Sequence, residues 1–115
     1  MGKMSKDKGK RFEREIAKYL IEQGFLARRS AQYAGNTGEA ADVIGLDGIH
    51  IECKHQESMR LYDWMEQAVR DAKPSGNLPA VFHRKNNAET LVTMRLEDWM
   101  EVYRGTLPNV GDDDP

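Results

Sequence analysis

Three charged residues, Asp42, Glu52 and Lys54, stand within a mostly apolar stretch of the sequence. Alternate residues of a strand point to the same face of a sheet, so Glu52 and Lys54 would share a face. Placing two carboxylates and a lysine together in an apolar stretch lowers the stability of the fold if these residues have only a structural role. They make sense if both acids bind a hard cation, which prefers oxygen ligands, and if the lysine faces a phosphate. The spacing therefore indicates metal-dependent chemistry on a phosphate group.

Two short strands joined by a tight turn would position these three residues. Residues 41–46 are apolar except for Asp42, and residues 49–54 alternate between apolar and polar types. The Asp47-Gly48 pair between the two runs predicts a hairpin, because both residue types tolerate positive φ.

The type of turn decides whether the two acids face one another. A strict two-residue loop would pair Asp42 with Cys53 and point the aspartate away from Glu52. A type I turn with a bulge at Gly48 would pair Asp42 with Glu52 and point both carboxylates the same way. We therefore predict the bulged turn, or a local distortion of the strand at Asp42.

A third carboxylate, that of Glu13, lies on the expected first helix, residues 9–23. Gly24 ends this helix. Wound at about 100° per residue, the helix carries Glu13 inside its apolar arc, where a carboxylate must be paired, protonated or bound to a metal. A buried ion pair and a metal ligand both remain open. The arc consists of Phe12, Ile16, Ala17, Tyr19 and Leu20.

The remaining elements predict an α/β domain. Their order would be αβββαββα, with a crossover that sets the fourth strand beside an earlier one and gives a mixed β-sheet flanked by helices. Trp64 would flank the apolar stripe of the second helix, and Gln67 would lie off it. We expect residues 1–8 to be a flexible basic N-terminus, 9–104 the folded domain and 105–115 a disordered acidic tail. The further strands are expected at 25–29, 79–85 and 90–94, and the further helices at 59–73 and 96–103.

Composition limits the class of protein. The chain has 115 residues and a formal net charge of −2, enough for one domain with a modest core. No apolar run is long enough to span a membrane, so a cytoplasmic protein without membrane contact is expected. The one cysteine, Cys53, excludes an internal disulfide and is expected to be a buried thiol rather than a nucleophile.

Basic residues concentrate near the N-terminus. Residues 1–30 hold nine Lys and Arg against four acids, which is compatible with a polyanion docking on one side or with a solvated basic segment. The segment 30–38 is rich in small and polar residues and could contact phosphate and sugar, or be an ordinary connection. The candidate DNA contacts are Lys10, Arg11, Arg14, Arg28, Arg29, Ser30, Tyr33 and Gln67.

Other kinds of site find little support in the sequence. It has no Cys/His spacing for zinc, no glycine-rich phosphate loop and no Gly-x-Ser-x-Gly motif. The three histidines, His50, His55 and His83, show no metal-ligand spacing. His50 and His55 are near enough to Glu52 and Lys54 to assist, but surface positions are expected for these two.

Glu13, Asp42 and Glu52-Cys53-Lys54 together resemble the PD-(D/E)xK nuclease superfamily. The segments 9–15, 24–25 and 28–30 more narrowly resemble the archaeal-type Holliday junction resolvases and their phage relatives. The resemblance covers roughly residues 8–75. Ala41 replaces the proline that often precedes the strand aspartate, and the spacing from Asp42 to Glu52 is short.

This resemblance implies a restriction-endonuclease-like core and a Mg²⁺-dependent DNA endonuclease, for which Mn²⁺ could substitute. Asp42, Glu52 and the Cys53 carbonyl would hold the metal, and Glu13 would complete the shell directly or through water. Lys54 would orient the attacking water or neutralise charge on the phosphate.

The resemblance also implies a homodimer that acts on branched or duplex DNA in a prokaryotic or phage-infected cell. A structure-selective Holliday junction resolvase is the narrower expectation. Two alternatives stay open, namely another restriction, repair or exonuclease of the superfamily and a catalytically inactive DNA-binding or assembly protein.

Overall fold

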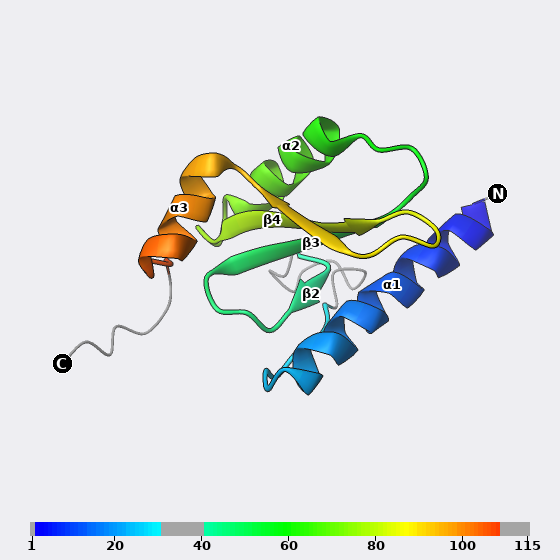
Figure 1. Cartoon of the computed structure of the whole chain (residues 1–115), viewed down its shortest axis with the longest axis horizontal. Helices are drawn as coiled ribbons and strands as arrows, with labels where there is room; N and C mark the ends of the chain where they lie inside the picture. The colour runs from blue at the N-terminus through cyan, green and yellow to red at the C-terminus, as the bar shows by residue number, and fades with distance from the viewer. Residues whose placement is uncertain (1, 31–40, 109–115) are drawn as a thin grey trace.

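The protein is a five-stranded mixed sheet with three helices, as the sequence predicts (Figure 1). The computed structural model describes residues 2–30 and 41–108, with side chains from residue 6 onward. The strands lie in the order β1-β2-β3-β4-β5, and only β3 and β4 run parallel. The elements are α1 (Gly2–Glu22), β1 (Arg28–Arg29), β2 (Val43–Ile44), β3 (Ile49–His55), α2 (Leu61–Ala72), β4 (Leu78–Arg84), β5 (Leu91–Met94) and α3 (Leu96–Arg104).

The two longer helices pack on the sheet. Helix α1 contacts β1, β2 and β3, and its Phe12 joins Val43 and Ile51 in one buried cluster. Helix α2 contacts β3 and β4, where Trp64 and Ala68 pack around Val81 of β4. The strand β3 is therefore the strand that both helices cover. It is also the strand that carries Glu52 and Lys54.

Helix α1 begins at Gly2, seven residues before the predicted start. Residues 2–8 contain lysine and methionine, which are good helix formers, and the helix continues through them without a capping residue to stop it. The predicted boundary at residue 9 was wrong for this reason. The expected flexibility of residues 1–8 stays a prediction.

Strand β1 is shorter than the predicted strand at 25–29. Gly24 has φ +101° and ends α1 as predicted, but the cap also uses Phe25, whose backbone N–H donates to the Leu20 carbonyl. Leu26 is 97% exposed, so pairing begins only at Arg28. The expected disordered tail lies mostly outside the described residues.

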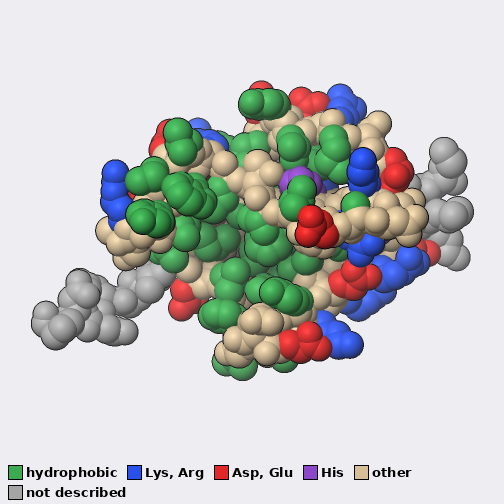
Figure 2. Space-filling view, in the orientation of Figure 1, with side chains coloured by type: hydrophobic (Ala, Val, Ile, Leu, Met, Phe, Trp, Pro, Cys, Tyr) green, Lys and Arg blue, Asp and Glu red, His purple; other side chains and the backbone are tan. Residues whose placement is uncertain are grey.

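Apolar side chains are exposed on β5 and α3, and Figure 2 shows hydrophobic side chains gathered over this end of the molecule. Leu91 is 53% exposed, Leu96 76% and Tyr103 74%, and the Trp99 ring stacks on Tyr103 with centroids 5.6 Å apart. In the part of the chain that is described, none of the helices is both long and apolar enough to cross a membrane.

Candidate active site

The hairpin that carries the predicted acids has the expected register. Val43 pairs with Ile51, so continuing the ladder by one residue sets Asp42 opposite Glu52. Gly48 has φ +84°, the conformation that a bulged turn needs at this position. The predicted register is therefore confirmed, and the turn itself is closed by the Ile49 backbone N–H, which donates to the Leu46 carbonyl at 3.1 Å.

Asp42 also departs from regular pairing, as the alternative form of the prediction expected. Its backbone N–H donates to the Ile51 carbonyl at 2.9 Å, although Val43 is the residue that pairs with Ile51. Its carboxylate Oδ2 accepts the backbone N–H of Cys53 at 2.7 Å. The Asp42 carboxylate therefore lies along the edge of β3, where a neighbouring strand would otherwise accept this hydrogen bond.

The same geometry places the carbonyl of Cys53. The N–H and C=O of a strand residue point toward the same neighbouring strand, as their joint use in an antiparallel pair requires. Because the Cys53 N–H points to Asp42, its carbonyl also faces the side of β3 where Asp42 lies. An aspartate carboxylate and a backbone carbonyl thus border the same edge. The Cys53 thiol is free and buried, as predicted.

Glu52 lies on the face of β3 that α2 covers, and it is 3% exposed. Gln67 of α2 donates its amide Nε2 to Glu52 Oε2 at 3.1 Å, and its Oε1 accepts Lys54 Nζ at 3.0 Å. His50 Nε2 lies 3.2 Å from Glu52 Oε1. One side chain of α2 therefore holds the glutamate and the lysine of the Glu-x-Lys motif in place.

One expectation fails at this network. His50 is 3% exposed, so it is not a surface histidine. Strand alternation puts His50 on the same face as Glu52, and α2 covers that face. Trp64 of α2 is buried as well, with its ring beside that of the buried His83.

Glu13 forms an ion pair, which is one of the two possibilities that the sequence left open. Arg29 Nε donates to Glu13 Oε1 at 2.9 Å, and the Glu13 side chain is 16% exposed. The contact joins α1 to β1 on the face of the sheet opposite α2. Arg29, which was expected to contact DNA, is therefore paired with Glu13, which was expected to bind the metal.

Electrostatics link the three carboxylates. Burial raises the pKa of Glu52, and the negative charge of Asp42 raises it further, against the lowering effect of the His50 hydrogen bond. Burial and the Asp42 charge also raise the pKa of Glu13, partly offset by Arg29. Burial, then the charges of Asp42, Glu13 and Glu52, raise the pKa of the Cys53 thiol, so this cysteine stays protonated. The negative charge of Asp42 thus raises the pKa of both glutamates.

The donor set suits a hard divalent cation. Carboxylate and carbonyl oxygens are its preferred ligands, and a cation would relieve the charge that raises the pKa of both glutamates. Among the described residues, however, no three His, Cys, Asp or Glu side chains come together as a ready metal cluster. Asp42, Glu52 and the Cys53 carbonyl have the donor chemistry that such a cation takes, and in this structure the carboxylates of Glu52 and Glu13 are both hydrogen-bonded to neighbouring side chains.

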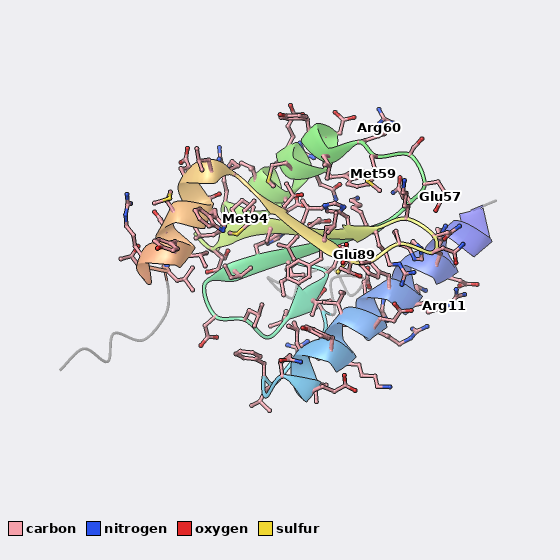
Figure 3. All side chains as sticks on the ribbon, viewed as in Figure 1. Arg11, Glu57, Met59, Arg60, Glu89 and Met94 are labelled. Atoms are coloured by element: carbon pink, nitrogen blue, oxygen red, sulfur yellow. The ribbon has the colours of Figure 1, made fainter. Side chains whose placement is uncertain are left out.

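The predicted DNA contacts divide into three groups. Lys10, Arg11 and Arg14 of α1 and Arg28 of β1 are exposed, as a DNA contact requires. Figure 3 shows Arg11 projecting from α1 into solvent. Tyr33 lies outside the described residues. Three candidates are not free surface donors, because Ser30 is 5% exposed, Arg29 pairs with Glu13 and Gln67 bridges Glu52 and Lys54.

The ion pair of Glu13 and Arg29 supports a prediction about stability. Arg29→Ala should leave a half-buried carboxylate unpaired beside Asp42 and lower the free energy of unfolding by about 1–2 kcal/mol. Arg29→Ala combined with Glu13→Gln should recover much of this loss, since the uncompensated charge is then gone. Urea unfolding of both variants, with the exposed Arg14→Ala as control, measures the difference. Equal stabilities of the Arg29→Ala and Arg14→Ala proteins would contradict the prediction.

The sequence of this chain matches that of a known protein family. The family model described as "Phage putative PDDEXK endonuclease" matches residues 4–110 of the chain. The chain belongs to this phage PDDEXK endonuclease family. The family assignment confirms the predicted PD-(D/E)xK superfamily and supports a nuclease as the class of enzyme.

A solved structure supports the same assignment of this PDDEXK endonuclease. Hjc, a Holliday junction resolvase from the hyperthermophilic archaeon Archaeoglobus fulgidus, is 28% identical in sequence and superimposes with a TM-score of 0.56. The match covers 76% of this chain and 72% of Hjc. The restriction-endonuclease-like fold and the resemblance to the archaeal resolvases are therefore confirmed. The search of curated proteins found no match.

Proposed function

We propose that this PDDEXK endonuclease is a Mg²⁺-dependent, structure-selective nuclease that resolves four-way DNA junctions. The observation that carries the proposal is the hydrogen-bonded chain Glu52–Gln67–Lys54 beside the Asp42 carboxylate. Glu52 and Lys54 lie on the face of β3 that α2 covers, and Asp42 lies along the adjoining edge at Cys53. Similarity to an archaeal Holliday junction resolvase supports the choice of substrate.

Each residue of the candidate active site would have a separate role in cleavage. A divalent cation bound by Asp42, Glu52 and the Cys53 carbonyl would polarise the scissile phosphate and activate a water molecule. Lys54 would contact the phosphate and offset the charge that builds up on its oxygens. Gln67 would hold the Lys54 ammonium and the Glu52 carboxylate at a constant separation.

Cleavage of a labelled four-way junction, compared with linear duplex, flap and single-stranded DNA, tests the proposal. Each substrate is incubated with Mg²⁺, with Ca²⁺ and with the Asp42→Asn protein in Mg²⁺. Paired cuts in the junction, made by wild type in Mg²⁺ alone, are expected. Cuts in other substrates would keep the nuclease and replace the junction by another substrate. Tight metal-independent DNA binding without cleavage would favour the inactive binding protein.

We also propose that the nuclease acts as a homodimer, because two strands of a junction must be cut and one chain contributes one such site. The exposed apolar side chains of β5 and α3 support a contact there, since patches of this kind mark protein interfaces. Burying stacked Trp99 and Tyr103 would add large apolar contact area.

Changing this surface should dissociate the dimer. Leu96→Glu combined with Trp99→Glu should convert a particle of twice the chain mass to one of a single chain, because two charges would have to be buried at the contact. Light scattering during size-exclusion chromatography measures the mass. The control is Tyr62→Glu, which changes a residue 89% exposed on α2. A wild-type monomer, or a double variant that remains dimeric, would count against this interface.

A further inference from the structure

A groove lies beside the candidate active site, between the N-terminal part of α1 and the end of β3. Its volume is about 490 Å³. Figure 3 shows Glu57 on the loop that follows β3, near this part of α1. Cys53 and Lys54 of the candidate active site line the groove, so the groove adjoins that site at the end of β3. The lining residues are Lys8, Gly9, Cys53, Lys54, His55, Gln56, Glu57 and Ser58.

Lys8 is the cationic side chain of the groove that could hold an anion. The other lysine of the lining, Lys54, already donates its ammonium group to Gln67 of α2. Glu57 is the one carboxylate among the lining residues, and its Oε2 accepts the backbone N–H of Asn86 at 2.5 Å. No ion pair joins Lys8 to a carboxylate of residues 6–30 or 41–108. With respect to these described residues, the Lys8 ammonium is therefore available to a ligand.

Gly9 provides an independent observation. It stands in the interior of α1 without positive φ, so the backbone conformation does not require glycine. A Cβ added there would meet no atom within 4 Å, so packing does not require glycine either. Glycine inside a helix costs about 0.5–1 kcal/mol relative to alanine. A glycine that neither fold nor packing requires is suited to letting a ligand approach the helix backbone.

We propose that this groove binds a backbone phosphate of the DNA strand being cut, next to the phosphate that contacts Lys54. Lys8 supplies the opposite charge, and the bare backbone at Gly9 lets the strand lie close to α1. A strand of DNA fits better than a free anion, because the groove adjoins the active site and has the volume of a typical ligand site. The proposal rests on the nuclease function above and adds the path of the strand.

A matched pair of lysine variants tests the charge. Lys8→Ala and Lys18→Ala remove the same charge from the same helix, but Lys18 is exposed and does not line the groove. Both are made in the Glu52→Gln protein, so that DNA is bound and not cut. Lys8→Ala should raise the Kd for a labelled four-way junction roughly five- to ten-fold and reduce the salt slope by about 1. Lys18→Ala should change the Kd less than about two-fold. Equal effects of the two substitutions would overturn the role of Lys8.

Two substitutions at Gly9 test the close approach. Gly9→Ala and Gly9→Leu should leave the melting temperature unchanged or higher, because both residues are better helix formers and the space above Gly9 is open. DNA affinity should fall several-fold with alanine and further with leucine. A lower melting temperature would indicate a structural role for Gly9, and unchanged affinity in both variants would show that no strand passes there. Either result overturns the proposal.

The outcomes separate this proposal from the proposed function. If wild type cuts DNA while the Lys8 and Gly9 variants bind it like their controls, only the groove assignment fails. If wild type neither binds nor cuts any DNA tested, the nuclease function fails and the groove assignment fails with it.

Discussion

Replacing Glu52 with glutamine is expected to abolish DNA cleavage and to leave DNA binding intact. Glutamine keeps the shape of the side chain and an oxygen that can accept the Gln67 amide, but it removes a negative metal ligand. Loss of one such electrostatic group should lower the cleavage rate by roughly 10²–10³-fold. Single-turnover cleavage and equilibrium binding, measured on the same labelled DNA, give the two quantities.

The matched control for this experiment is Glu89→Gln, the same chemical change at an exposed residue in the loop before β5 (Figure 3). This variant should cut DNA like wild type. Retained cleavage in the Glu52→Gln protein would refute a metal role for this carboxylate. Lost binding in that protein would point to a folding defect, which a melting curve would reveal.

The Glu52→Gln protein should also be more thermally stable than wild type in metal-free buffer at pH 7. The pKa of Glu52 is raised in the folded chain, so its ionised form opposes folding above that pKa. The advantage of glutamine should shrink as the pH falls through the raised pKa, and it should vanish below the ordinary value of 4.5, where the carboxyl is protonated folded or unfolded. Melting temperatures across this range check the sign. A constant difference at all pH values would exclude the charge as its cause.

Lys54→Ala should produce the second large loss, a cleavage rate lower by about 10²–10³-fold with little change in metal binding. The ammonium group is expected to act on the phosphate and not on the cation, because it is positively charged and has no lone pair with which to bind a metal. The rise in melting temperature on adding Mn²⁺ or Ca²⁺ reports metal binding without requiring cleavage.

The control here is Lys85→Ala, which removes a lysine exposed just after β4 and should leave the rate unchanged. A normal rate in the Lys54→Ala protein would remove this lysine from the mechanism. A thermal shift lost together with the rate would instead assign Lys54 to the integrity of the metal site.

Local patterns in the sequence were sufficient for the order of elements and for the central hairpin. Alternation over residues 49–54 and the Asp47-Gly48 turn predict two paired strands, and the requirement that Asp42 and Glu52 face one another selects the register that the structure has. These features depend on residues a few positions apart, where the strand period and the turn conformation act directly. Boundaries were less exact, as the early start of α1 and the shortened β1 show.

Partners distant in the sequence were decided by the tertiary structure alone. Gln67 was predicted off the stripe of its helix and as a DNA contact, yet it joins Glu52 to Lys54 because α2 packs on that face of β3. Glu13 could equally have been a metal ligand, and Arg29 satisfies it because β1 runs beside α1. His50 was expected at the surface and is buried under the same helix. Periodicity identifies which residues share a face, but only the packing of helices on the sheet determines what that face meets.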